Sequence, residues 1–228
     1  WSSDARGAMS SRRIVIREGA AVLAADFIPS EAESAAAADA EDLASVSGFA
    51  SASRRAERLA WRKLLREVLA EYFGCAFPEG LRIEYSASGA PRLKDFPDME
   101  ISVSHCRDMA AVAVSHTGAP AESRCDDGGA CGVDIERADR NFDRAAPRYL
   151  SPAERALSSD PRLPAAVWCA KECLFKMQGR EGLDLLRDIV VTGIDFTAGT
   201  VAGHIVGHRE AAMRMLFPDE KHLIIFRI

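Results

Sequence analysis

The sequence GVDIE at residues 132–136 carries the alternation that decides the fold class. Successive side chains of a β-strand point to opposite faces, so Val133 and Ile135 face one side while Asp134 and Glu136 face the other. The pattern predicts a strand with its apolar face in a core and two carboxylates on the opposite face. A half-exposed strand explains this segment when it is taken alone. Paired carboxylates repel each other unless water or a cation separates them.

The sequence WCAKECLFK at residues 168–176 predicts part of a helix that runs from about residue 164 to 179. Trp168, Glu172 and Lys176 are spaced four residues apart, so they share one stripe of that helix. A Glu-to-Lys pair at this spacing is common on exposed helices and contributes about 0.2–0.5 kcal/mol, but it leaves the flanking aromatic residues unexplained. Together with the strand, the helix indicates a site, because carboxylates and lysines suit a hard cation beside phosphate oxygens.

The remaining pattern mixes helices with strands that read as antiparallel, which predicts an α+β fold. Helices are expected over residues 30–45, where Ser30 and Glu33 form a capping box, over 53–73, where Gly74 ends the helix, and after Ser151. Strands are expected at residues 14–16, 20–23, 81–85, 101–103, 110–114, 189–196 and 222–228.

A change in composition divides the chain into two parts. Gly, Pro, Asp and Ser dominate the segment from Thr117 to Ala130, which is typical of a connecting segment. We therefore expect a linker at residues 119–130 between an N-terminal α+β half at 12–118 and a C-terminal half at 131–228.

The composition excludes several classes of protein. Hydrophobic residues make up 48% of the 228 residues and charged residues 28%, as in ordinary globular proteins. The net charge of −5 argues against binding nucleic acid over the whole surface. No stretch approaches the roughly 20 apolar residues of a membrane helix, and the N-terminal residues lack the pattern of a signal peptide. A cytoplasmic protein that does not enter a membrane is expected.

The six cysteines show no spacing typical of a disulfide framework, so reduced thiols are expected. Cys169 and Cys173 are one helical turn apart and would offer half of a metal site. No second pair with suitable spacing accompanies them.

Taken together, the segments 132–136 and 168–176 resemble the two-part signature of 4′-phosphopantetheinyl transferases of the surfactin-synthetase (Sfp) type. That signature is a G-[IV]-D-x-E strand followed by a W-x-x-K-E-x-x-x-K helix, and here Asp134 and Glu172 stand 38 positions apart. The resemblance implies a monomer of two similar α+β halves related by pseudo-twofold symmetry, with the active site at their interface. It also implies transfer of phosphopantetheine from coenzyme A to a serine of an acyl-, aryl- or peptidyl-carrier protein, releasing 3′,5′-adenosine bisphosphate.

The resemblance assigns roles to individual residues. Asp134, Glu136 and Glu172 would bind Mg²⁺, or Mn²⁺ in its place. Glu172, Lys176 and Glu136 would be the catalytic residues, with Glu172 as the general base. The residues expected to bind coenzyme A are Arg62, Arg92, Ser104, His105, Lys171 and Lys176. Arg92 is included because Ala90 stands where the family often has a basic residue, and Arg144, Arg148 and Tyr149 are expected to contact the carrier protein.

Two rival functions remain open. A catalytically silent relative would hold coenzyme A or a carrier domain without turnover, and the missing basic residue at Ala90 leaves room for it. A nucleic-acid-binding module would use the basic helix at residues 54–66, although the aromatic residues that stack on bases are scarce around it.

Overall fold

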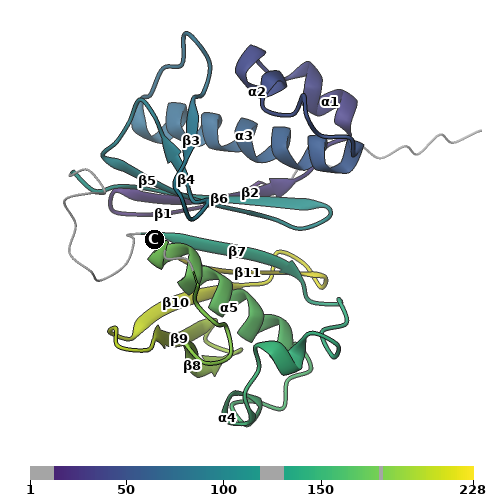
Figure 1. The fold of residues 1–228 in the computed structure, drawn as a ribbon, viewed down its shortest axis with the longest axis vertical. Coiled ribbons are helices and arrows are strands. Elements are labelled where there is room, and N and C mark those ends of the chain that lie inside the picture. The colour runs from purple at the N-terminus through teal and green to yellow at the C-terminus, as the bar shows by residue number, and fades with distance from the viewer. Residues whose placement is uncertain (1–12, 119–130, 180–181) are drawn as a thin grey trace, which may run out of the picture.

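The computed structural model describes residues 13–118, 131–179 and 182–228, so the linker expected at 119–130 lies outside the described residues. Two antiparallel sheets lie against each other, and each carries a long helix on its outer side (Figure 1). This mixture of helices and sheets confirms the α+β prediction. The pseudo-twofold relation and the boundaries of the halves stay predictions. Within the described residues, no helix is long and apolar enough to cross a membrane.

The first sheet has four strands in the order β1-β2-β6-β5, and the long helix α3 covers it. Apolar residues of α3 pack against β6: Leu65, Val68 and Leu69 meet Val112 and Val114 in one buried cluster. The strands are β1 (Ile14–Glu18), β2 (Ala21–Phe27), β5 (Met99–His105) and β6 (Met109–His116), and the helix is α3 (Ala52–Phe73). A separate two-stranded hairpin consists of β3 (Ile83–Tyr85) and β4 (Pro91–Leu93).

The single helix expected over residues 30–45 is wrong. The segment forms two short helices, α1 (Glu31–Ala36) and α2 (Ala40–Ala44). The predicted capping box of Ser30 and Glu33 is present at the start of α1. Asp39 forms a second capping box with Asp42 and begins a new helix there, because a short carboxylate satisfies backbone N–H groups best at a helix start.

The second sheet has five strands in the order β7-β11-β10-β9-β8, and α5 packs on one of its faces. Its strands are β7 (Gly132–Arg137), β8 (Ile189–Asp195), β9 (Thr200–Ile205), β10 (Ala211–Leu216) and β11 (His222–Arg227). Its helical segments are η2 (Ala146–Arg148), α4 (Pro152–Arg155) and α5 (Leu163–Gln178).

The strands β9 and β10 were not predicted. In β9 the alternation of buried residues passes through Gly203, where a Cβ atom would lie 2.8 Å from the carbonyl oxygen of Val190. Only glycine fits this close approach, so the middle of the strand lacks the apolar side chain that would have marked it.

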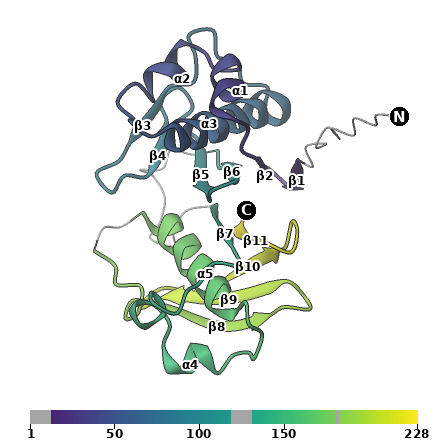
Figure 2. The same cartoon turned by 90° about the vertical axis from the view of Figure 1, so that its right-hand side faces the viewer.

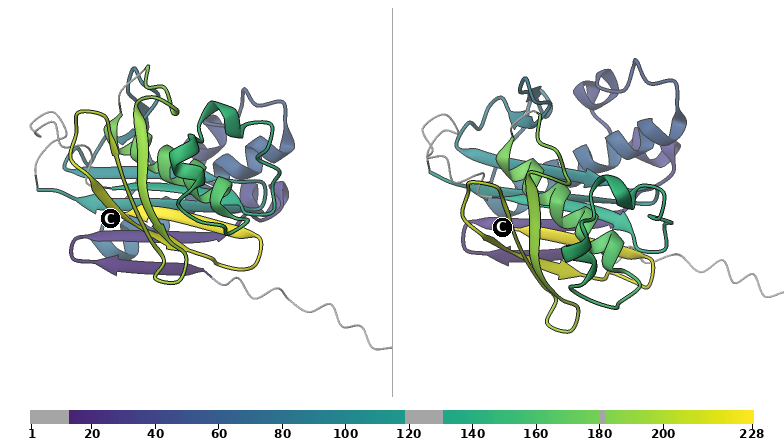
Figure 3. Two further views of the ribbon diagram at one scale, coloured as in Figure 1. Left: turned by 90° about the horizontal axis from the view of Figure 1, so that it is seen from below. Right: turned by 60° about the horizontal axis from the view of Figure 1, so that its bottom comes forward.

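The two sheets share a buried interface between them. Val133 and Ile135 of β7 and Phe226 of β11 pack against residues of the first sheet such as Leu23 and Ala111. Seen from below, β11 runs alongside the strands of the first sheet (Figure 3). The predicted alternation of residues 132–136 is therefore confirmed, because the apolar side chains of β7 face a core that belongs to both halves.

Serine hydroxyl groups connect the two sheets along β5 and β7, which lie next to each other (Figure 2). The Oγ atom of Ser102 accepts a hydrogen bond from the backbone N–H of Val133 at 3.0 Å, and Ser104 accepts from Ile135 at 3.2 Å. Since β7 is the edge strand of its sheet, these N–H groups would otherwise be buried without a partner. The serines therefore take the place of a neighbouring strand.

Replacing Ser102 with alanine should lower the free energy of unfolding by about 1–3 kcal/mol, since the buried N–H of Val133 loses its acceptor. Urea denaturation of the wild type and the variant would measure the change. The matched control is Ser159→Ala, because Ser159 is exposed and its loss should change stability by less than about 0.5 kcal/mol. Equal stability of the Ser102 variant and the wild type would contradict the structural role of this hydroxyl.

Candidate functional site

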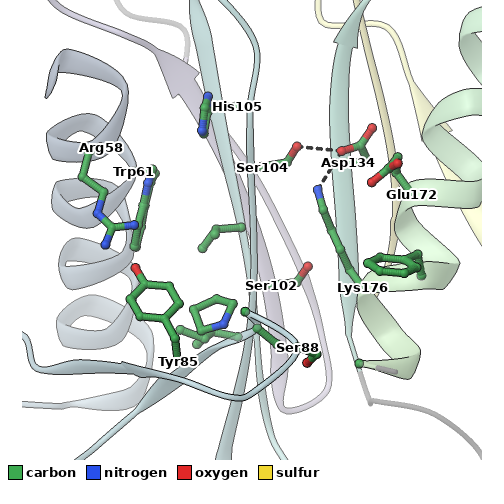
Figure 4. Close-up of a pocket in the computed structure, with 17 residues that line it drawn as sticks. Arg58, Trp61, Tyr85, Ser88, Ser102, Ser104, His105, Asp134, Glu172 and Lys176 are labelled. Atoms are coloured by element: carbon green, nitrogen blue, oxygen red, sulfur yellow. Dashed lines mark hydrogen bonds and ion pairs between the residues drawn. The ribbon is translucent and has the colours of Figure 1, made fainter. Parts of the chain in front are cut away.

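A cavity of about 470 Å³ opens where the two halves meet beside β5 and β7 (Figure 4). Residues of both halves line it, so neither half contains the complete site. The first half contributes side chains from α3, from the β3–β4 hairpin and from β5, and the second half contributes side chains from β7 and α5. The polar and aromatic residues that line the cavity are Arg58, Trp61, Tyr85, Ser88, Ser102, Ser104, His105, Asp134, Glu172, Phe175 and Lys176.

Asp134 stands at the centre of a polar network in this cavity. Its Oδ1 atom accepts hydrogen bonds from Ser104 Oγ at 2.8 Å and from Lys176 Nζ at 2.7 Å. The ammonium group of Lys176 also donates to the carbonyl oxygen of Val133 at 3.1 Å. Burial disfavours the charge of Lys176, but the attraction and hydrogen bond to Asp134 together with the attraction to Glu172 outweigh it, so the pKa of Lys176 is raised. The strand and the helix therefore meet at a charged contact, as the sequence indicated.

Glu172 and Glu136 add two more carboxylates around Asp134. Burial raises the pKa of both, and repulsion by Asp134 raises it further. Glu172 lines the cavity together with Asp134, whereas Glu136 forms an ion pair with Arg140 and does not line it. The structure thus places two of the three expected metal ligands in one cavity and the third on the same strand beside it.

The three carboxylates suit a hard divalent cation, because Mg²⁺ and Mn²⁺ prefer oxygen ligands. Burial and mutual repulsion oppose their ionisation, and a bound cation would relieve both effects. Their oxygen atoms do not all lie within 4.8 Å of one another. Among the described residues, the group of three metal-ligating side chains that meets this limit is Cys106, Asp108 and His222.

Arg58 is a basic residue of the cavity that the sequence analysis did not identify. Its guanidinium carbon lies 5.0 Å from the ring centroid of Trp61 and 5.1 Å from that of Tyr85. Within the described part of the chain, its Nε atom is buried without a hydrogen-bond partner. The guanidinium brings a positive charge to the cavity, which suits an anionic group of a ligand.

Ser104 and His105 line the cavity from the end of β5. The Nδ1 atom of His105 is 3.5 Å from Glu57. Burial lowers the pKa of His105, and Glu57 partly opposes this effect.

Arg62, which is expected to bind coenzyme A, does not line the cavity. The side chain is buried, donates from Nε to Asp42 at 2.6 Å and donates from Nη2 to the carbonyl oxygen of Leu81. Arg62 therefore holds α3 against α2. Arg58, one turn earlier on α3, lines the cavity instead.

Lys171, which is expected to bind a phosphate, does not line the cavity either. Its side chain is fully buried, and its Nζ atom lies 2.8 Å from Glu154 and 2.7 Å from the carbonyl oxygen of Leu185. Burial lowers the pKa of Lys171, and Glu154 opposes this shift. Since Glu154 also accepts from the backbone of Ser151 and Val191, the pair anchors α5 to α4 and β8.

Arg92 and Tyr149 likewise differ from expectation. Arg92 is exposed on β4 and does not line the cavity. Tyr149 is buried, and its hydroxyl donates to the carbonyl oxygen of Pro164, so it cannot contact a carrier protein. The centroid of its ring lies 5.1 Å from that of Trp168, a partly buried residue that packs against the core of the second half. Arg144 and Arg148 are exposed, as a docking surface requires.

The basic side chains of α3 are mostly engaged within the protein. Ion pairs link Arg55 to Glu31, Lys63 to Glu67, and both Arg62 and Arg66 to Asp42. These contacts neutralise the charges that a nucleic-acid backbone would need. Among the described residues, Cys75, Cys106, Cys169 and Cys173 are free thiols.

Replacing Glu172 with glutamine should stabilise the protein in metal-free buffer at neutral pH. Because its pKa is raised above the ordinary value of 4.5, the folded state binds this proton more tightly than the unfolded state does. The free energy of unfolding therefore falls as pH rises through the interval between the two values. Denaturation in EDTA across a pH series would measure the free energy of unfolding. It should be higher for the variant than for wild type at pH 7, and the difference should vanish below pH 4. The exposed Glu79→Gln should show no such gain, and a Glu172 variant less stable than wild type at pH 7 would contradict this electrostatic strain.

The comparison with known proteins finds a match in the second half of the chain. No curated protein matches the chain. A family model described as the 4′-phosphopantetheinyl transferase superfamily matches residues 130–217, a span that contains β7, α5, Asp134, Glu172 and Lys176. The part of the chain that supplies the acidic side of the cavity is therefore similar to the 4′-phosphopantetheinyl transferase superfamily.

Proposed function

We propose that this protein transfers the 4′-phosphopantetheine group of coenzyme A to a serine of an acyl- or peptidyl-carrier protein, as an Sfp-type enzyme. The observation that carries the proposal is the convergence of Asp134, Glu172 and Lys176 in one cavity. These residues come from a strand and a helix inside the span that matches the superfamily. The first half completes the cavity with an arginine, a histidine and two aromatic rings.

Asp134, Glu136 and Glu172 would hold the divalent cation, Mg²⁺ or Mn²⁺. When bound, the cation would supply positive charge to the pyrophosphate of coenzyme A. Glu136 would have to release its ion pair with Arg140 to take part.

The chain's own residues suit the remaining tasks of a phosphoryl transfer, which needs mainly positioning and charge neutralisation. Glu172 would accept the proton of the carrier serine as its oxygen attacks the β-phosphate. Burial raises the pKa of this carboxyl, which makes it a better base than an exposed glutamate. The bond from the β-phosphorus to the bridging oxygen then breaks, and 3′,5′-adenosine bisphosphate leaves. Lys176 keeps its positive charge through its contact with Asp134 and would neutralise the leaving phosphate.

The first half would bind the nucleotide end of coenzyme A. The guanidinium of Arg58 lies beside the rings of Trp61 and Tyr85, so the cavity offers a cation and an aromatic surface together. Ser104 and His105 lie between this region and Asp134 (Figure 4). Arg144 and Arg148 supply an exposed basic surface that would attract an acidic carrier protein.

The proposal is tested by incubating the protein with coenzyme A, Mg²⁺ and a panel of apo-carrier proteins. Mass spectrometry should show the gain of one phosphopantetheine on at least one carrier and no gain in EDTA. Asp134→Asn and Glu172→Gln should each abolish the labelling while circular dichroism shows a folded protein. Glu210→Gln, an exposed acidic residue of the same half, should label like wild type. Full labelling by both cavity variants would refute the assigned site.

A silent relative that binds coenzyme A without turnover is the second candidate. Two observations favour it, since Ala90 offers no basic group to the cavity and Arg92 does not replace it. In this case coenzyme A would bind in calorimetry while no carrier of the panel gained mass.

Arg58→Ala should raise the KM for coenzyme A about 10- to 100-fold, because a hydrogen bond to a charged group is worth about 1.5–3 kcal/mol. The matched control is Arg92→Ala, which removes an arginine outside the cavity and should change this KM little. Steady-state kinetics at saturating carrier protein would compare the two. A larger effect at Arg92 than at Arg58 would contradict the placement of the nucleotide end.

A further inference from the structure

A second group of metal-ligating side chains lies where the turn between β5 and β6 meets the start of β11. It consists of Cys106 and Asp108 from the first half and His222 from the second. Their ligand atoms all lie within 4.8 Å of one another. The Nε2 atom of His222 is 2.8 Å from Asp108 Oδ1, and Cys106 Sγ is 3.7 Å from the same oxygen. None of these residues lines the cavity of the proposed transferase site.

The imidazole of His222 faces a carboxylate at each ring nitrogen. Its Nδ1 atom lies 2.9 Å from both oxygens of Asp219, while Nε2 faces Asp108. A neutral imidazole carries one N–H, so it can donate to one of these carboxylates and not to both. The other contact requires a second proton, or a bound cation that replaces this proton and moves Nε2 and Oδ1 apart, since each metal–ligand bond is about 2 Å long.

Asp219 is the better acceptor for the single N–H. Its Oδ1 atom also accepts the backbone N–H groups of Lys221 and His222, so the turn holds it rigidly. A carboxylate that fixes Nδ1–H leaves the lone pair of Nε2 directed toward Asp108 and Cys106. Histidine ligands in metal sites are oriented in the same way, because a carboxylate holds one ring nitrogen while the other nitrogen faces the metal.

A cavity beside the group gives an ion a path to Asp108 and His222. Arg137 pairs with Asp108 through Oδ2 at 2.9 Å, so Oδ1 stays directed at His222. Cys106 and His222 are buried. Asp108, Asp219 and His222 line a cavity of about 590 Å³ that also includes Glu220 and Lys221. The positive charges of Arg137 and Lys221 oppose a cation, so a binding ion must gain its affinity from the ligands themselves.

We propose that Cys106, Asp108 and His222 form a binding site for a divalent transition metal ion such as Zn²⁺, which would join the two halves. Sulfur and nitrogen ligands select Zn²⁺ or Co²⁺ over Mg²⁺, so this site differs in chemistry from the carboxylate site. Three protein ligands leave a fourth position for water.

Binding at this site releases a proton. Burial raises the pKa of the Cys106 thiol to about 11, so the thiol is protonated at neutral pH without metal. The ion binds the thiolate, the thiol proton leaves to solvent, and the apparent affinity therefore increases with pH.

Titration of the metal-free full chain with CoCl₂ tests the proposal, because a thiolate–cobalt bond gives a charge-transfer band in the near ultraviolet. Wild type should show the band at one equivalent, and ZnCl₂ should displace it. Cys106→Ser should lose the band, and His222→Gln should lose or strongly weaken it. Asp219→Asn should weaken the affinity about 10- to 100-fold through the orientation of His222.

Two control variants separate this site from other metal binding. Cys75→Ser removes a partly exposed thiol of the first half and should keep the band. Glu172→Gln alters the proposed transferase site and should also keep it, so failure of either proposal can be recognised independently. No band in wild type, or a band that survives Cys106→Ser, would overturn the proposal. So would nitrogen NMR spectra in which both ring nitrogens of His222 remain protonated after addition of ZnCl₂, because His222 would then be a charged bridge between two aspartates.

Discussion

The placement of the two halves against each other depends on the hydrogen bonds that Ser102 and Ser104 accept from the backbone of β7. An edge strand normally presents its N–H groups to solvent or to another strand. Here a row of side-chain hydroxyls receives them, so β7 joins a surface of the first half without adding to its sheet. This connection fixes the register between the halves. Because the hydroxyl of Ser104 also donates to Asp134, the same register determines where the central carboxylate of the cavity lies.

Local periodicity in the sequence was sufficient to predict the strand and the helix that carry the acidic side of the cavity. The alternation of residues 132–136 and the four-residue spacing of Glu172 and Lys176 follow from the geometry of one strand and one helix. Each element had enough apolar residues to define its buried face. The convergence of the strand and the helix came from the family resemblance, because nothing in either segment records the distance between them.

Arg62 and Lys171, two residues expected at the site, lie away from the cavity for the same physical reason. Arg62 and Arg58 are one turn apart on α3, and their roles depend on which side chain α2 covers. Lys171 is next to Glu172 in the sequence, but its ammonium group points into the core, where it forms an ion pair with Glu154. From the sequence pattern alone, a basic residue can equally well form an ion pair within the protein or bind a ligand. Partners 17 or 20 positions away in the sequence, as Glu154 is from Lys171 and Asp42 from Arg62, decide between these roles.

Gly132 begins the strand that carries Asp134, but its small size matters more for the packing of helix α5 than for the strand. A Cβ atom at this position would lie 2.9 Å from the carbonyl oxygen of Cys173 and 2.5 Å from the side chain of Met177. Any larger residue would therefore act as a spacer that lifts α5 away from β7. With only a hydrogen on this α-carbon, α5 lies close enough to β7 for Lys176 to reach Asp134. A position without a functional group therefore controls the dimensions of the cavity.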